Sequence, residues 1–277
     1  MLWRLGGALA ARVVKDDIGA FAAALTYNLL FALFPLALAL AALVPALHLA
    51  AAQRALLAPL SAVVDPEVVS LIGHTAAHGG HVPSPSLACV GVGGYLWGMS
   101  AAFRRLMDAF NHAYGCPLPL RRSPWETVVL SVVLALTLGV GLVAAMVVAV
   151  VGQDLTRAVL PALAWWAGGP VAAALRWLTL LALAVVMLAV LYGVAPDRPR
   201  VFHWFSPGAV AAIAIWMAIS LGFSRYLSHF NSYNLVYGSV GAVILLLLYL
   251  YFLSYALLIG GELNALLQQR RPVESST

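Results

Sequence analysis

The most informative reactive group in this sequence is a carboxylate that ends a long uncharged stretch. Glu262 follows 36 residues, 226–261, that carry no formal charge, and Asn264 comes two residues later. A charged residue at the centre of a membrane helix costs about 2.5–3.5 kcal/mol on translocon scales, so such a group needs a partner or a role. Two interpretations follow. Glu262 is either a coupling carboxylate or gate partner of a basic residue, or one half of a structural ion pair with Arg104 or Arg198.

A second group of polar residues lies between two apolar stretches. Residues 228–239 read SHFNSYNLVYGS, and Arg225 precedes them. An arginine at this place either snorkels to lipid headgroups or faces a cavity and binds an anionic headgroup. The segment after it is either a plain loop or the lining of a polar pocket. The pocket would be formed by Asn231, Tyr233, Asn234, Tyr237 and Gly238.

Enzyme motifs are absent from the sequence. It contains no G-x-x-x-x-G-K-[ST] phosphate loop, no H-E-x-x-H and no C-x-x-C. His74, His78 and His81 have the spacing of metal ligands on a helix, but two glycines interrupt that segment and favour a solvated loop. No compact ligand spacing relates the other candidates, which are Asp16, Asp17, Asp108, His112, Glu126, Asp197 and His203. We therefore predict no catalytic residue, no metal site, no cofactor and no enzymatic activity.

The composition explains why polar groups are so few. Of the 277 residues, 63% are hydrophobic and 9% are charged, and the mean hydropathy is +0.96. A typical soluble domain has about 25% charged residues, so soluble enzymes, disordered chains and secreted disulfide scaffolds are disfavoured. The net charge is +5, but the basic residues are scattered in pairs beside apolar stretches. That pattern is typical of membrane proteins, and it predicts no nucleic-acid partner.

The elements that must position these groups are membrane-spanning helices. A crossing takes about 20 mostly apolar residues, and six stretches qualify: 25–49, 87–103, 127–152, 171–195, 205–224 and 236–258. Pro35 lies inside the first stretch and predicts a kink there. Residues 2–15 predict an amphipathic helix whose basic face holds Arg4, Arg12 and Lys15. Residues 155–170 predict a short helix at the membrane interface.

The basic residues predict how the chain is oriented. With six crossings and a cytoplasmic N-terminus, the cytoplasmic segments hold 11 of the 15 basic residues, and the other side holds four: Arg54, Arg157, Arg176 and Arg225. The excess of positive charge therefore places both termini in the cytoplasm. We expect an all-α polytopic membrane protein with six transmembrane helices, an N-terminal amphipathic helix and short interfacial helices. It would form one membrane domain over residues 1–270, followed by a short cytoplasmic tail over residues 271–277.

Several segments together resemble the YihY/BrkB family of bacterial inner-membrane proteins, once named ribonuclease BN. The resemblance covers about residues 10–268, and it departs at Tyr249, where the family often has tryptophan. Its motifs are DDIGAFAAALTY at 16–27, FALFP at 31–35, residues 106–114 with Asn111, residues 192–196, WFSPGA at 204–209, the polar stretch 223–242, and GGELNA at 260–265.

The resemblance implies six transmembrane helices in a bacterial cytoplasmic membrane. The family's links to envelope phenotypes point toward transport of lipids or other amphiphiles, and its nuclease name is regarded as a misassignment. We therefore expect a non-enzymatic transporter or handler of amphiphilic envelope molecules, with membrane lipids and envelope lipid-transport proteins as partners. The alternatives are a scaffold for an envelope complex and a tRNA-processing ribonuclease; the oligomeric state is not predicted. The expected cavity residues are Asn111, Tyr114, Trp204, Pro207, Gly208, Arg225, Asn231, Tyr233, Asn234, Tyr237, Gly238, Glu262 and Asn264.

Overall fold

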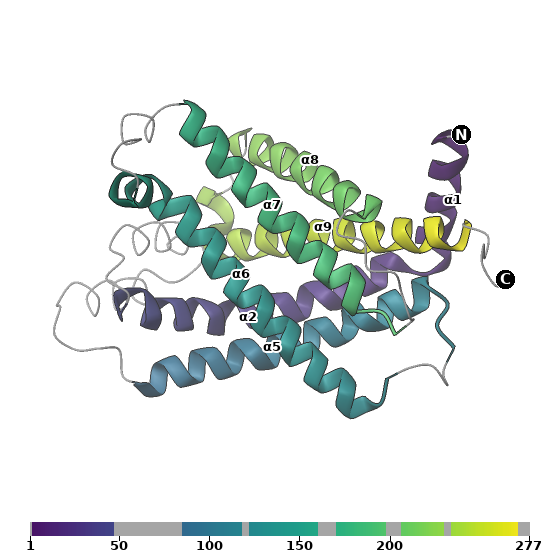
Figure 1. The fold of residues 1–277 in the computed structure, drawn as a ribbon, viewed down its shortest axis with the longest axis horizontal. Helices are drawn as coiled ribbons and strands as arrows, with labels where there is room; N and C mark the ends of the chain where they lie inside the picture. Colours follow the sequence, from purple (N-terminus) through teal and green to yellow (C-terminus); the bar gives the residue numbers. More distant parts are fainter. Residues whose placement is uncertain are drawn as a thin grey trace.

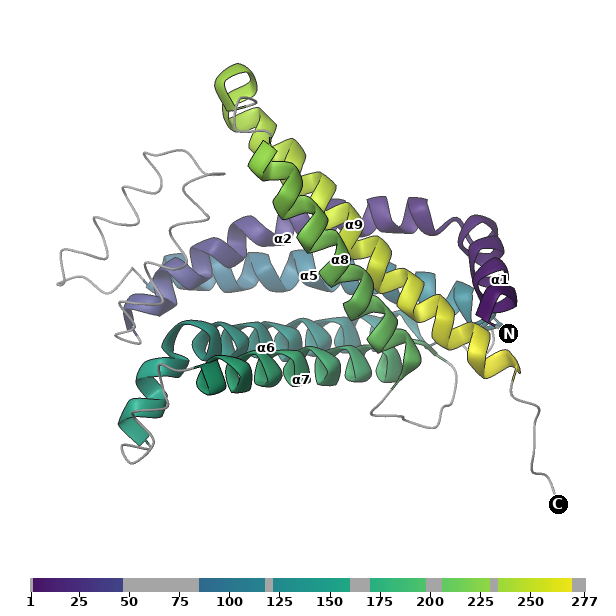
Figure 2. The ribbon, with the colours of Figure 1, turned by 90° about the horizontal axis from the view of Figure 1, so that it is seen from above.

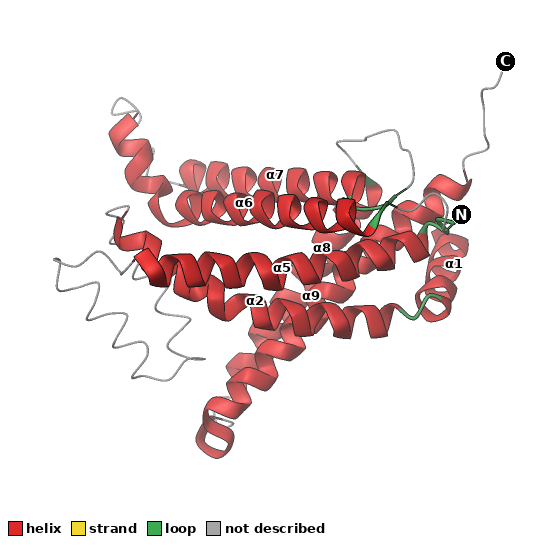
Figure 3. Ribbon diagram, turned by 90° about the horizontal axis from the view of Figure 1, so that it is seen from below, coloured by secondary structure: helices red, strands yellow, loops and turns green. Residues whose placement is uncertain are grey.

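A computed structural model describes residues 2–46, 85–117, 122–159, 170–197, 206–229 and 234–270. Within these ranges the regular structure is entirely helical, as predicted, and Figure 3 shows no strand in them. The helices are α1 (Leu2–Lys15), α2 (Ile18–Ala46), α5 (Pro85–Ala113), α6 (Pro124–Val159), α7 (Pro170–Val194), α8 (Pro207–His229) and α9 (Asn234–Arg270). Residues 155–159 continue α6, so the predicted separate helix at 155–170 does not begin there. Its remaining residues up to 169 lie outside the described ranges.

Five of the described helices are long and apolar enough to cross a membrane. They contain the segments Ile18–Ala39, Pro124–Ala145, Ala173–Val194, Pro207–Tyr226 and Val243–Gln269. The predicted count of six is not confirmed, because α5, which contains the stretch 87–103, is not among them. Helix α5 combines glycines with Arg104, Arg105 and Asp108, and it is therefore less apolar than the other long helices.

Helices α2 and α5 form the tightest pair, and small residues bring their backbones together. A Cβ atom placed on Gly91 would lie 2.6 Å from the backbone nitrogen of Ala39, and one placed on Gly98 would lie 3.0 Å from Cα of Ala32. Between these two points, Gly94 lies under the ring of Pro35. Close approach through glycine and alanine is a common way for membrane helices to associate. Pro35 lies inside the continuous helix α2, and the kink expected there stays a prediction.

The six long helices contact one another in a ring. Helix α6 packs on α5, α7 on α6, α8 on α7, and α9 on α8, and α9 then returns to α2. Figures 1 and 2 show both termini at the same end of this bundle. At the opposite end the α8–α9 hairpin diverges from the α6–α7 hairpin (Figure 2). We call the end that carries both termini the closed end, because there Phe110 of α5 contacts Gly261 of α9 across the ring.

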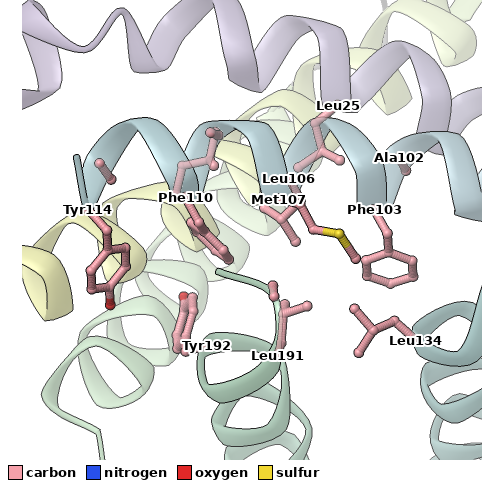
Figure 4. Packing of buried hydrophobic residues seen from close by; sticks show 14 of the residues in the cluster. Leu25, Ala102, Phe103, Leu106, Met107, Phe110, Tyr114, Leu134, Leu191 and Tyr192 are labelled. Carbon is pink, nitrogen blue, oxygen red and sulfur yellow. The ribbon is translucent and has the colours of Figure 1, made fainter. Parts of the chain in front are cut away.

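The best-packed part of the core lies on the half of α5 that leads to the closed end. Phe110, Leu106 and Met107 are fully buried there, and Figure 4 shows their side chains facing α7 and α9. The rings of Phe110 and Tyr192 meet edge to face, with centroids 5.5 Å apart. A Cβ atom on Gly261 of α9 would overlap the ring of Phe110. Large side chains of α5 and α7 therefore fit against glycines of α9.

Helix α1 lies across the closed end, at a large angle to the other helices (Figures 1 and 2). Its last turn is followed by Asp17, whose φ of 47° lies in the left-handed region, and α2 begins at the next residue. Aspartate is among the few residues that adopt this conformation readily. Arg12, one of the residues of the predicted basic face, points inward to α9, whereas Val14 is 81% exposed. The inward orientation of Arg12 follows from the buried carboxylate that it meets there.

Candidate functional site

Six of the described candidate residues gather in two places at the closed end. Pro207 and Gly208 open α8 beside Glu262 and Asn264 of α9, whereas Asn111 lies near the end of α5. Tyr114 directly follows α5, and its side chain is buried next to Phe110 and Tyr192 (Figure 4). Trp204, Asn231 and Tyr233 lie outside the described ranges. Asn234, Tyr237 and Gly238 belong to the first turns of α9, at its other end.

Asn264 connects α9 to the start of α8. Its Oδ1 accepts a hydrogen bond of 2.8 Å from the backbone nitrogen of Gly208, and its Nδ2 donates one of 3.0 Å to the hydroxyl of Ser206. That hydroxyl also accepts a hydrogen bond of 3.1 Å from the backbone nitrogen of Ala209. Ser206 is thus the N-cap of α8, and Pro207 occupies the first helical position, where a missing N–H does no harm. Asn264 satisfies a second free N–H group of the same helix start.

Replacing Asn264 by alanine is expected to destabilise the protein by about 1–3 kcal/mol, because the buried N–H of Gly208 loses its acceptor. Thermal unfolding of the purified protein in detergent would measure this. Gln268, one turn further along α9, is exposed, and Gln268→Ala serves as the matched amide control. Equal unfolding midpoints for both variants would contradict the assignment.

The helices α8 and α9 cross in backbone contact at Gly208 and Gly260. A Cβ atom on Gly208 would overlap the carbonyl oxygen of Gly260, and one on Gly260 would lie 2.5 Å from the carbonyl oxygen of Gly208 and 2.9 Å from Cβ of Ala212. The hydroxyl of Tyr192 on α7 lies against the same place and donates a hydrogen bond of 2.7 Å to the carbonyl oxygen of Leu257. Three helices therefore meet here without any side chain between the two glycines.

A second polar contact joins the ends of α5 and α7 to the segment before α6. Nδ2 of Asn111 donates a hydrogen bond of 2.8 Å to Oδ2 of Asp197, and the backbone nitrogen of Asp197 donates one of 2.9 Å to Oδ1 of Asn111. Arg122 forms an ion pair of 3.0 Å with Asp197 and donates to the carbonyl oxygens of Val194 and Ala195 at 3.0 and 3.2 Å. Asn111 is therefore part of a clamp that holds three helices together.

Sequence reasoning missed two of the three members of this clamp. It weighed Asp197 as a metal ligand, and it counted Arg122 among the cytoplasmic basic residues. A usable signal was present, since Asp197 directly follows the matching stretch 192–196 and is one of only ten acidic residues in the chain. Among the described residues, no group of three or more His, Cys, Asp or Glu side chains is arranged to hold a metal ion.

Glu262 is the most unusual residue of the closed end. Its side chain is 0% exposed, and its Oε2 lies 3.8 Å from Nη1 of Arg12 on α1. Neither oxygen of this carboxylate has a hydrogen-bond partner within the usual distance and angle. Nη1 of Arg12 also has no hydrogen-bond partner. The carboxylate of Asp16 is a further electrostatic neighbour of Glu262. The other terminal nitrogen of Arg12 donates to Oε1 of Gln269.

The partner of Glu262 differs from those predicted. Arg104 does not pair with it; that guanidinium donates instead to the hydroxyl of Ser100, and Arg198 lies outside the described ranges. Arg12 takes this place because α1 folds back over the end of α9. Arg225 is exposed near the end of α8 and does not join the group. Seventeen residues of α8 separate it from Gly208, which is about 25 Å along a helix.

Long apolar helices that bury a few polar groups at their ends define a polytopic helical membrane protein. A family model described as virulence factor BrkB matches residues 9–277, and the chain therefore belongs to the BrkB family. This confirms the resemblance found in the sequence.

Named relatives extend the comparison. The ribonuclease-like protein YfkH of Bacillus subtilis is 29% identical over 192 residues, which is 67% of either chain. A UPF0761 membrane protein of Pseudoalteromonas translucida is 32% identical over 83 residues, or 30% of this chain and 28% of that one. One of Vibrio vulnificus is 32% identical over 103 residues, or 36% and 33%. The chain thus spans about a third of the length of these two UPF0761 relatives. No solved structure matches the chain.

Proposed function

We propose that this protein is a non-enzymatic transporter or handler of lipids and other amphiphilic envelope molecules. In this proposal the chain crosses the bacterial cytoplasmic membrane six times, with α5 as the sixth crossing and both termini in the cytoplasm. The antiparallel pairing of α5 with α2 supports the additional crossing, since a helix packed along a membrane span shares its surroundings. The common position of the termini supports the even number (Figure 1).

The observation that carries the proposal is the buried Glu262. A fully buried carboxylate that lies 3.8 Å from a guanidinium and next to the carboxylate of Asp16 is poorly stabilised. Burial of such a pair usually costs more free energy than its attraction returns, so a protein built only for stability gains little from it. Charged groups within membrane segments are typically functional. We assign Glu262 the role of a gate at the closed end. The gate would open when Arg12 moves away from Glu262 or when the carboxylate of Glu262 gains or loses a proton.

The arrangement of the helices supports a gate at this end. The closed end is sealed by the Gly208–Gly260 crossing and by the clamp of Asn111, Asp197 and Arg122, whereas the α8–α9 hairpin diverges from α6–α7 at the other end (Figure 2). A shift of α9 that separates Glu262 from Arg12 would also affect the Gly208–Gly260 crossing, because Glu262 and Gly260 lie two residues apart on α9. Arg225 at the opposite end of α8 is assigned to headgroup contact on the outer side.

Movement of a labelled phospholipid across the bilayer of reconstituted liposomes tests the assignment. We expect Glu262→Gln to change the transport rate about 5-fold or more, the size of a typical coupling between two states of a protein. Asp108→Asn removes an exposed carboxylate from α5 and is the matched control, expected to act like the wild-type protein. If Glu262→Gln and Arg225→Ala both transport like the wild-type protein, the assigned roles are wrong. Liposomes in which the wild-type protein moves no lipid would overturn the function itself.

The name of YfkH supports a second candidate, an RNA-cleaving activity. In this chain the acidic residues nearest Glu262 are Asp16 and its neighbour Asp17, at the junction of α1 and α2. The test is cleavage of RNA by highly purified protein with added divalent metal. Loss of cleavage on changing Asp16 and Asp17 to asparagine would support this function, and the absence of cleavage would exclude it.

A further inference from the structure

One exposed side of α5 changes from apolar to charged within two turns. Trp97 is 82% exposed, and Val90 is exposed two turns before it. Arg104 lies seven residues after Trp97, and Asp108 lies eleven residues after it. At 100° per residue, all four side chains therefore point to the same side of the helix. Trp97 and Val90 suit contact with acyl chains, whereas Arg104 lies where this surface becomes polar. With α5 as a crossing, the level of Arg104 would mark the headgroup boundary on this helix.

Arg104 points away from the nearest carboxylate. Asp108 lies one turn along the same face, at a spacing where an arginine and an aspartate on a helix can pair. Instead, Nη1 of Arg104 donates a hydrogen bond of 2.5 Å to the hydroxyl of Ser100, and among the described residues no carboxylate lies within 4.0 Å of its guanidinium. Helical side chains tilt toward the N-terminus, so the guanidinium lies on the membrane side of its own Cα atom.

The hydroxyl that accepts from Arg104 belongs to the contact between α5 and α6. Ser100 and Ser131 are buried, and their oxygens lie 2.6 Å apart. The hydroxyl of Ser131 also donates to the carbonyl oxygen of Val128. Val128 is exposed one turn before Ser131, and Trp125, 75% exposed, comes in the turn before that. A half-buried guanidinium thus lies between two helices, with an exposed tryptophan on each of them.

We propose that Arg104 binds the phosphate of a membrane phospholipid at the outer surface of the α5–α6 contact. The guanidinium has five N–H donors, and one bond to Ser100 leaves the others for an acceptor with several oxygens. A phosphate group has several acceptor oxygens. In a phospholipid, this group lies at the headgroup boundary, and the acyl chains attached to it would cover Trp97. The indole of Trp125 lies at the depth where its N–H reaches headgroups. This site does not depend on Glu262 or on transport, but it rests on the proposed crossing of the membrane by α5.

Native mass spectrometry of the purified protein, titrated with dioleoyl-phosphatidylglycerol, tests the site. We expect Arg104→Gln to lose one tightly bound lipid, with about tenfold weaker binding, the loss of one charge-assisted contact. Arg105→Gln is the matched control: it removes the same charge from the next, exposed residue and is expected to retain that lipid. Equal losses in both variants would overturn the site, because they would show only a general effect of positive charge.

Two further arms separate the alternatives. Excess inorganic phosphate is expected to leave the bound lipid in place; displacement by phosphate would show a site for a free anion and overturn the lipid assignment. Arg104→Lys keeps the charge but lacks the planar fork, so we expect binding between that of the wild type and that of Arg104→Gln. Should Arg104→Gln fail to fold, Arg104→Lys decides alone: binding equal to the wild type would contradict recognition by the guanidinium.

Discussion

Replacing Gly208 by alanine is expected to be the most disruptive small change in this protein. The added methyl group would overlap the backbone carbonyl oxygen of Gly260 and lie 2.5 Å from the amide carbon of Asn264. A backbone carbonyl cannot rotate out of the way, so α8 and α9 must move apart. Overpacking of a tight core costs about 1–3 kcal/mol and sometimes more, and we expect the upper end here.

The matched control for this substitution lies on the same helix. Gly222 has nothing within 4 Å of the position that its Cβ would take. Because alanine is preferred over glycine in helices by about 0.5–1 kcal/mol, Gly222→Ala should leave the unfolding midpoint in detergent unchanged or raise it. A midpoint for Gly208→Ala that equals that of Gly222→Ala would show that the helices do not approach as closely as described.

The second large effect is expected at the clamp of Asn111, Asp197 and Arg122. Asp197→Ala removes a carboxylate that is 5% exposed, so the guanidinium of Arg122 loses its ion-pair partner and the amide of Asn111 loses its acceptor. Breaking a fully buried ion pair by removing one partner costs about 3–5 kcal/mol, and we expect no more than the lower end here, because Arg122 is 29% exposed and keeps its carbonyl acceptors. We expect a correspondingly lower midpoint of thermal unfolding, and a reduced yield of folded protein in the membrane.

A double-mutant cycle separates the ion pair from the general effect of truncation. If Asp197 and Arg122 act together, the double alanine variant is expected to lose clearly less stability than the two single variants combined. Asp108→Ala, on the exposed side of α5, controls for the loss of an acidic residue. Additive losses would mean that Arg122 is held by the carbonyl oxygens of Val194 and Ala195, not by Asp197.

The sequence alone predicted the helical fold and most helix positions, because long apolar stretches bounded by proline and charged residues leave few alternatives in a membrane. Pro124, Pro170 and Pro207 each begin a helix, where proline is best tolerated. The family was also predicted correctly from its polar motifs. The count of six crossings depended on the Gly-rich stretch 87–103. For a stretch of this kind, composition alone does not show whether it crosses the membrane.

The contacts between helices could not be predicted in the same way. Glu262 was recognised as important, but nothing in the spacing of residues shows that its partner is Arg12, near the other end of the chain. The role of Asn264 as an acceptor for the start of α8 likewise depends on how two helices cross. Asp197 follows α7, whereas Arg122 precedes α6, and only the tertiary fold brings the two residues together. Pairings of this kind depend on the packing angle of the helices, which a single sequence does not contain.

The docking of α1 on α9 has a consequence for biogenesis. Arg12 contacts Gln269, which is 257 residues away, so α1 emerges from the ribosome long before its binding surface exists. Until α9 is inserted, the guanidinium of Arg12 stays in water or among headgroups, and Glu262 enters the bilayer region without it. Assembly of this corner therefore has to wait until α9 has been made and inserted.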